Sequence, residues 1–227
     1  MNKSPDTKLI VMLTHNDKTV SNALALFNEC ADLDVDYWGI KTEPLSLEEM
    51  KTFVEAVHGK NKTAVFESVC YTEEEGILDA RKAFECNCDI LMGTKYSDKI
   101  NSFCKEHNIK YMPFIGKPSL VPSILEGTWQ DFASDIDSSL KNDTFGVDYL
   151  AYRHVQNPHI ILKDVFAHSK KTNVCIAGSV DSFNKIDEII SLGASFFTIG
   201  SAFFENCFGQ TIPEQIEKVA KYIKSKK

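Results

Sequence analysis

Two short apolar runs near the end of the chain, NVCIAGSV at residues 173–180 and FFTIGSAFF at residues 196–204, each lead into a glycine followed by a serine. Between them lies a segment with isoleucines at helical spacing, and it stops at Gly193. Glycine commonly ends helices. Apolar runs without polar alternation are typical of parallel strands that are buried on both faces. This stretch therefore predicts a strand–helix–strand unit with a Gly-Ser turn after each strand.

The same unit repeats along the chain. Short runs rich in Val, Ile, Leu, Phe and Tyr alternate with stretches in which apolar residues recur at helical spacing, which is typical of parallel strands joined by helices. Eight such units in 227 residues predict an α/β fold, a single (β/α)₈ TIM barrel domain spanning residues 1–227. The predicted strands are residues 8–14, 36–40, 63–69, 89–93, 110–115, 148–152, 173–177 and 196–199.

The alternative is an open, doubly wound sheet. That fold usually carries a glycine-rich turn after its first strand, whereas this chain has Thr14-His15-Asn16-Asp17 there, without glycine. The barrel is therefore the favoured fold. The longest irregular region, residues 116–127, is expected to form a loop over the site.

Composition limits the function classes. The formal net charge is -7, which disfavours nucleic acid as a partner because phosphates require basic surface. The N-terminal apolar run is too short for a signal peptide, and no stretch predicts a membrane span. Seven cysteines without a disulfide framework favour a cytoplasmic protein. No residues show convincing metal-ligand spacing, and no cofactor is predicted.

The glycine and serine after each of the last two strands give the most specific functional signal. In a barrel of this kind the active site lies where strands end and loops begin. Glycine lets backbone N–H groups approach an anion, serine adds a hydroxyl donor, and a short following helix would add partial positive charge. Gly178, Ser179, Gly200 and Ser201 are therefore predicted to bind phosphate. The alternative is that the glycines only form tight turns.

The segments around the two Gly-Ser turns resemble a known family of barrels. IAGSV, a helix and then GASFFTIGSAFF look like the C-terminal quarter of the ribulose-phosphate-binding barrels. That superfamily includes ketogluconate-phosphate aldolases, pentose-phosphate epimerases, hexulose-phosphate synthases and phosphoribosylanthranilate isomerases. Residues 88–119 also resemble the aldolase members. The resemblance implies a phosphorylated small-molecule substrate, held at the two turns.

The chain departs from that pattern in two places. The aldolases hold a Schiff-base lysine on strand six, where this chain has Tyr152-Arg153-His154. Arginine cannot form that imine, which places the standard aldolase mechanism in doubt. The acidic pairs of the pentose-phosphate epimerases are missing at the matching strand ends.

Two residues are the candidates for catalysis. Glu67 lies inside an apolar strand, and a buried carboxylate needs a partner. A glutamate beside a lysine could abstract a proton next to a carbonyl and stabilise the resulting oxyanion, or it could be a structural ion pair. Lys95 is expected to polarise or capture the carbonyl, or else to clamp a phosphate or carboxylate.

The remaining charged residues at strand ends are candidates for substrate binding. Lys41 and Lys117 could contact substrate charge or be simple surface lysines. Arg153 suits a bidentate contact to carboxylate or phosphate. Asp17 could bind a metal, but a helix cap is the expected role.

These residues define three functional hypotheses. The first is an isomerase, epimerase or aldol-type lyase that moves a proton next to the carbonyl of a phosphorylated sugar or keto acid. The second is a phosphoribosyl-type transferase or synthase that needs Mg²⁺, with Asp17 or Glu43 as ligands. The third is a phosphate-binding barrel without catalysis. Under any of them, copies could associate as a homo-oligomer through the outer helices.

Overall fold

A closed barrel of parallel strands forms the centre of the protein. The computed structural model describes residues 6–156 and 158–226, and its strands follow the order β1-β12-β11-β10-β7-β6-β5-β4 around the barrel. This confirms the predicted (β/α)₈ fold. The barrel strands are β1 (Lys8–Met12), β4 (Tyr37–Lys41), β5 (Thr63–Cys70), β6 (Ile90–Lys95), β7 (Lys110–Phe114), β10 (Gly146–Tyr149), β11 (Asn173–Ile176) and β12 (Phe196–Ile199).

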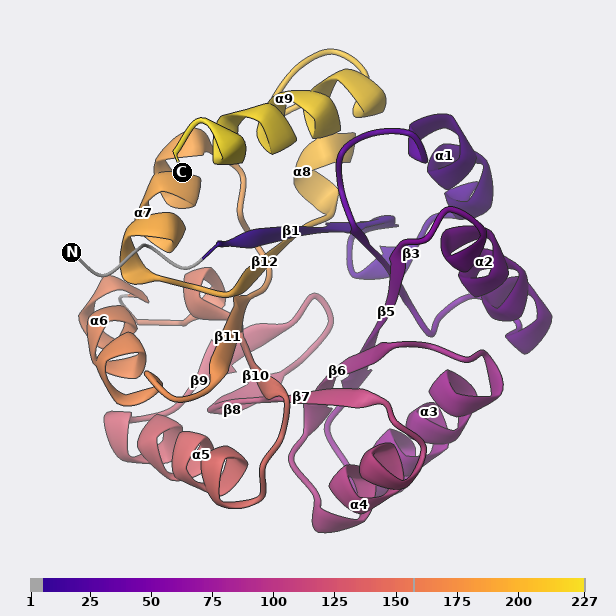
Figure 1. Cartoon of the computed structure of the whole chain (residues 1–227). Helices are drawn as coiled ribbons and strands as arrows, with labels where there is room; N and C mark the ends of the chain where they lie inside the picture. The colour runs from indigo at the N-terminus through magenta and orange to yellow at the C-terminus, as the bar shows by residue number, and fades with distance from the viewer. Residues whose placement is uncertain (1–5, 157, 227) are drawn as a thin grey trace.

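Helices surround the barrel on all sides (Figure 1). They bury an apolar face against the strands, as helices in this architecture must. The four-residue α8 (Ser201–Phe204) lies between β12 and the last helix. The ring consists of α1 (Ala23–Cys30), α2 (Leu47–Gly59), α3 (Glu73–Glu85), α4 (Asp98–Glu106), α5 (Trp129–Lys141), α6 (Pro158–His168), α7 (Phe183–Leu192) and α9 (Ile212–Lys224). Among the described residues, no helix is both long enough and apolar enough to cross a bilayer.

Local sequence signals explain where several helices begin and end. Ser46 and Glu49 form a capping box at the start of α2. The side chain of Thr72 accepts a hydrogen bond from the backbone N–H of Glu75 at the start of α3. Gly193 ends α7 with φ of 81°, a conformation that glycine adopts without steric cost.

Strand register determines which side chains enter the barrel. Trp38 on β4 packs against Phe27 of α1, so residues 37, 39 and 41, which point to the opposite face of the strand, face the interior. Lys41 is one of them, and it pairs in register with Glu67 on β5. Both side chains therefore enter the barrel from neighbouring strands, at the carboxyl end.

Two small hairpins lie at the carboxyl end of the barrel. The first joins β2 (Thr14–His15) to β3 (Lys18–Thr19), with Asn16 and Asp17 at positive φ in its turn. Because this hairpin occupies the segment after β1, α1 begins only at Ala23.

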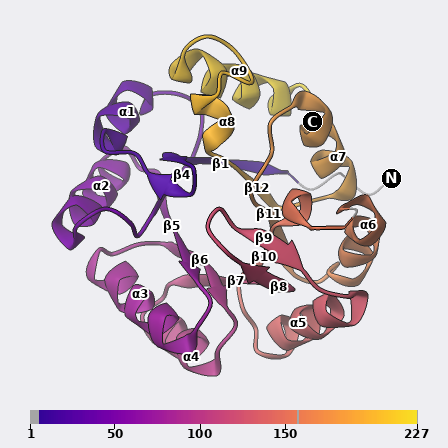
Figure 2. The same ribbon diagram turned by 180° about the vertical axis from the view of Figure 1, so that it is seen from behind.

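The second hairpin joins β8 (Lys117–Ser119) to β9 (Ile124–Glu126). Figures 1 and 2 show it reaching toward the barrel axis. The segment 116–127 is therefore ordered as a hairpin, contrary to the predicted irregular loop. The hairpin lies at the mouth of the barrel, where the backbone N–H of Ser123 donates a hydrogen bond to Asp17.

The sixth barrel strand begins earlier than predicted. β10 covers Gly146–Tyr149, whereas the predicted strand covered residues 148–152, and its last two residues belong instead to a short 3₁₀ helix, Ala151–Arg153. Gly146 lies outside the predicted strand. The strand requires it, because a Cβ there would lie 2.7 Å from the carbonyl oxygen of Asn173.

Candidate functional site

A cavity of about 560 Å³ opens at the carboxyl ends of the barrel strands. Active sites of this fold lie at this end. The residues that line it include charged and turn residues from the loops and strand ends around the barrel. Among them are Asp17, Lys41, Glu67, Arg153, Gly178, Ser179, Gly200 and Ser201.

A buried lysine lies between two carboxylates on the floor of this cavity. The Nζ of Lys41 is 3.2 Å from Oδ1 of Asp17 and 3.3 Å from Oε1 of Glu67. Their side chains are only 5–8% exposed. Charges removed from water interact strongly, and each depends on its partner. The sequence predicted that Glu67 would need a cation, and the structure supplies Lys41.

Arg153 binds Asp17 through both ends of its guanidinium group. Its Nη1 donates to Oδ2 at 2.6 Å and its Nη2 to Oδ1 at 3.1 Å. Burial raises the pKa of Asp17, but the Arg153 hydrogen bond and the Lys41 and Arg153 charges outweigh it and lower that pKa well below its usual range. Asp17 therefore stays ionised at neutral pH, and its carboxylate holds Lys41 and Arg153 beside each other.

Asp17 also anchors the β8–β9 hairpin. The backbone N–H of Ser123 donates to its Oδ2 at 2.8 Å. The expectation that Asp17 caps the first helix is therefore wrong, because α1 has Asn22 at its cap and no side-chain cap bond. The available signal was the Asn16-Asp17 pair directly after the first strand, which is typical of a tight turn at positive φ.

The turn after β11 lies directly against the Arg153 side chain. Gly178 has φ of 75°, and a Cβ there would lie 2.4 Å from Nε of Arg153. Ser179 also has positive φ, and its carbonyl oxygen accepts a hydrogen bond from Nζ of Lys185 at 2.7 Å. Within the described part of the chain, the backbone N–H of Ser179 donates to no protein group. Only glycine permits this close approach of backbone and guanidinium.

The turn after β12 packs against the first hairpin. A Cβ on Gly200 would lie 2.6 Å from Oγ1 of Thr14. The hydroxyl of Ser201 accepts a hydrogen bond from the backbone N–H of Asn16 at 3.1 Å. Both turns predicted to bind phosphate thus border the same cavity, although the contacts alone also fit a packing role for the glycines.

The structure does not bring Lys95 and Lys117 to this cavity. Lys95 is exposed at the end of β6. Lys117 begins β8, where its Nζ is 2.8 Å from Asp131 and its side chain is 64% exposed. Neither residue is among those that line the cavity.

Sequence reasoning missed Asp148. This residue lies on β10, is 0% exposed, and neither of its carboxylate oxygens has a hydrogen-bond partner in the described part of the chain. Burial, and then the negative charge of Glu67, raise its pKa well above the usual range. The misplaced strand boundary hid this residue, because a carboxylate at the start of a strand is normally solvated.

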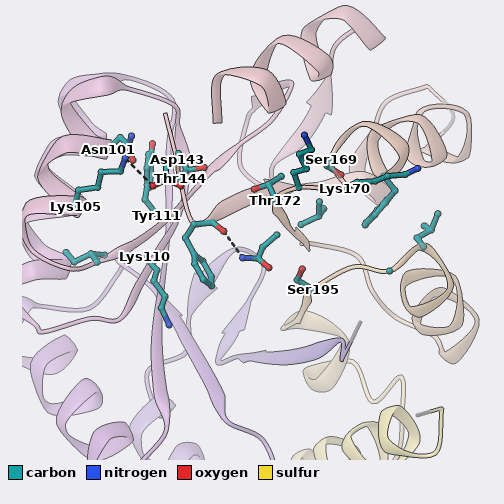
Figure 3. Close-up of a pocket in the computed structure, with 18 of the residues that line it drawn as sticks. Asn101, Lys105, Lys110, Tyr111, Asp143, Thr144, Ser169, Lys170, Thr172 and Ser195 are labelled. Carbon is teal, nitrogen blue, oxygen red and sulfur yellow. Dashed lines mark hydrogen bonds and ion pairs between the residues drawn. The ribbon is translucent and has the colours of Figure 1, made fainter. Parts of the chain in front are cut away.

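A larger cavity of about 1160 Å³ lies at the opposite, amino end of the strands (Figure 3). It has lysines on its walls, including Lys105 and Lys110. Asn101 and Lys105 both donate to the backbone carbonyl of Asn142, which is a structural contact. In this fold the amino end of the barrel contributes stability rather than catalysis, so we place the candidate site in the smaller cavity.

The described residues contain no group of three or more His, Cys, Asp or Glu side chains arranged to hold a metal ion. Asp17, suggested as a ligand for Mg²⁺, has both oxygens bound to Arg153.

Comparison with known proteins supports the fold. No family model and no curated protein matches the chain. Among solved structures, it is similar to orotidine 5'-phosphate decarboxylase from Pyrococcus horikoshii (TM-score 0.69, 12% identity), with 95% of this chain and 99% of that chain covered. Thiamine phosphate pyrophosphorylase from Pyrococcus furiosus gives a TM-score of 0.67 at 12% identity, with 99% and 98% covered.

A structure described as native KDPGal gives a TM-score of 0.65 at 14% identity, with 100% of this chain and 96% of that chain covered. The resemblance expected from the two Gly-Ser turns is thus confirmed at the level of fold. The chain has the same (β/α)₈ barrel as these enzymes, and it matches them over nearly its whole length. Identities this low establish the architecture and leave the reaction to be argued from the site.

Proposed function

We propose that the protein is an enzyme that moves a proton next to the carbonyl group of a phosphorylated sugar or keto acid, as an isomerase, an epimerase or an aldol-type lyase. The observation that carries this proposal is the Lys41–Glu67 pair, 3.3 Å apart on the cavity floor. A carboxylate base beside a fixed cation is what enolisation requires.

Each member of the pair has a distinct role in this proposal. Glu67 takes the proton from the carbon next to the carbonyl. Lys41 stabilises the negative charge that develops on the carbonyl oxygen. Because both side chains are nearly excluded from solvent, this stabilisation is stronger than it would be in water. The role first given to Lys95 passes to Lys41, because Lys41 is the lysine that lines the cavity.

The phosphate is assigned to the turns after β11 and β12. Gly178, Ser179, Gly200 and Ser201 border the cavity together, and the Arg153 side chain lies against Gly178. The free N–H of Ser179 and the partly exposed guanidinium supply hydrogen-bond donors to an anion. Two of the similar barrels, the decarboxylase and the pyrophosphorylase, are named for compounds that carry phosphate.

Isotope exchange tests the proton transfer directly. Purified protein is incubated in D₂O with a panel of phosphorylated sugars and keto acids, and loss of the C–H signal next to the carbonyl is followed by NMR. We expect exchange with at least one member of the panel, and a loss of about a hundredfold or more in Glu67→Gln. The matched control is Glu55→Gln, since Glu55 is exposed on α2. Exchange that survives Glu67→Gln would contradict the role of Glu67.

The other functional hypotheses are separated by the same panel. Turnover of a phosphoribosyl ester that stops when Mg²⁺ is chelated would support the transferase. Binding without exchange or turnover would support a barrel that only binds its ligand.

The proposal also includes a cytoplasmic location, which the seven free cysteines support. A homo-oligomer is compatible with the proposal.

A further inference from the structure

The strongest unexplained feature of the molecule is the carboxyl group of Asp148. Its neighbour on the strand, Tyr149, packs against Phe132 of α5, so the Asp148 side chain faces the barrel interior. There it is fully buried, and neither carboxylate oxygen has a hydrogen-bond partner in the described residues. Burying an ionised carboxylate in this way is strongly disfavoured, whereas the neutral acid is tolerated.

The charged groups around Asp148 are already paired with one another. Lys41 and Arg153 are the two cations that act on it. Lys41 contacts Asp17 and Glu67, and Arg153 binds Asp17 through two hydrogen bonds. Two cations thus face two carboxylates before Asp148 is counted, so an ionised Asp148 would leave an excess negative charge in the barrel.

The uncharged neighbours offer no compensation. Asp148 is in register with Phe114 on β7 and with Cys175 on β11. Cys175 is fully buried, and burial, followed by the charges of Asp148 and Glu67, raises the pKa of its thiol. The thiol therefore stays neutral beside the carboxyl group, and it supplies no positive charge.

We infer that Asp148 carries a proton in the folded protein, and that Asp148 and Glu67 form a pair of carboxyl groups that holds one proton and one negative charge. Glu67 is the charged member, because it is the one in contact with Lys41 and the cavity. Asp148 does not line the cavity, so it is a positioning residue that acts through Glu67.

The catalytic consequence rests on the proposed function of Glu67. A neutral Asp148 adds no second negative charge behind the base, so Lys41 remains available to the oxygen of the substrate. Loss of the Asp148 proton would place a second carboxylate in competition for Lys41. The protonation state itself can be measured without substrate, so that a failure of this inference and a failure of the proposed function can be told apart.

The first test measures proton uptake on folding. Above about pH 4 an unfolded aspartate is ionised, so folding of the wild type must return a proton to Asp148, and stability falls as the pH rises toward the folded pKa. Asp148→Asn lacks this proton. We expect the ratio of the wild-type unfolding constant to that of Asp148→Asn to rise by up to about tenfold per pH unit above pH 5.

The control for this test is Asp164→Asn, because Asp164 is exposed on α6. Its ratio to wild type should stay constant with pH. A constant ratio for Asp148→Asn as well would overturn the inference, since it would mean that Asp148 is ionised in both states.

Infrared spectroscopy provides a second test that does not depend on the stability of Asp148→Asn. The wild type at neutral pH should show the carbonyl stretch of a buried, protonated carboxylic acid. In Glu67→Gln the cations outnumber the remaining carboxylate, and we expect the midpoint of this band to move to lower pH. If the band is absent from the wild type, Asp148 is not protonated. If its midpoint is unchanged in Glu67→Gln, the two carboxyl groups do not act as a pair.

Discussion

Arg153 and Asp17 meet in a bidentate ion pair, at 2.6 and 3.1 Å, although 136 residues separate them in the chain. Arg153 comes from the loop after β10, and Asp17 from the hairpin after β1. The planar guanidinium matches the two carboxylate oxygens in a way that lysine could not. Both residues line the cavity, and the carboxylate of Asp17 also contacts Nζ of Lys41.

Removing the charge of Asp17 should destabilise the protein strongly. Asp17→Asn leaves Arg153 and Lys41 with excess positive charge in a largely buried site. We expect a loss of about 3 kcal/mol in the free energy of unfolding, at the lower end for a broken buried pair because the Arg153 side chain is 18% exposed. Chemical denaturation measures this change.

An exposed ion pair provides the control. Asp32 binds Lys60 at 3.0 Å, and the Asp32 side chain is 92% exposed. Asp32→Asn should therefore cost less than about 1 kcal/mol. Equal losses in the two variants would contradict the structural role of Asp17.

The contribution of Asp17 should disappear in acid. The folded-state pKa of Asp17 lies below its ordinary value, mainly through Arg153 and Lys41 and against the opposing effect of burial. A depressed pKa gives stability that is fully present above about pH 4 and is lost as the pH falls toward the folded pKa. The difference in unfolding free energy between wild type and Asp17→Asn should thus be constant from pH 7 to about pH 5 and shrink below about pH 4. A constant difference down to pH 3 would refute the assignment.

Replacing Lys41 should impair turnover far more than replacing Lys95. Lys41→Met removes the cation beside Glu67, and we expect kcat/KM to fall by about a hundredfold or more. Lys95 is exposed and outside the cavity, so Lys95→Met should have a much smaller effect. Steady-state kinetics on the substrate found by isotope exchange makes the comparison. The reverse ranking would restore Lys95 as the carbonyl-binding residue.

The turn at Gly178 should be required for ligand binding. A methyl group there would collide with Arg153, and φ of 75° disfavours any side chain. Gly193→Ala is the matched control, because Gly193 also has positive φ (81°) but lies at the end of α7, away from the site. The positive φ alone should cost each variant about 1–2 kcal/mol of stability, and Gly178→Ala should lose more because its methyl group would also displace Arg153.

Thermal shift with the phosphorylated ligand then separates the two glycines. A hundredfold excess of ligand over its Kd adds about 2.7 kcal/mol of stability. Gly193→Ala should retain this gain, and Gly178→Ala should lose most of it. A gain retained equally by both variants would mean that the phosphate lies elsewhere.

The barrel was predictable because its strands are short, apolar and bounded by clear helix signals. Ser46, Thr72 and Gly193 mark helix ends through local chemistry that a sequence displays directly. The hairpins were not predictable, because strands of two or three residues leave no periodic pattern. At β10, the prediction left out Gly146, and only the neighbouring carbonyl of Asn173 shows why the strand needs a glycine there.

The candidate site was predictable in part. Residues at strand ends were found because the fold itself selects them, and Lys41, Glu67 and Arg153 do line one cavity. The sequence could not distinguish them from Lys95, because a shift of one residue in a strand turns a side chain from the interior to the helices. The pairing of Asp17 with Arg153 depends on closure of the barrel, which no local pattern contains.

Asp17 joins three separate segments of the chain through one carboxylate, since it binds Arg153 after β10, Ser123 in the β8–β9 hairpin and Lys41 at the end of β4. Loss of the charge at position 17, 41 or 153 would leave an unmatched charge at another of these three positions. In natural variants of this protein, positions 17 and 153 should therefore vary together or not at all. An engineer who wishes to graft a new loop at any of these strand ends would have to redesign all three as a unit.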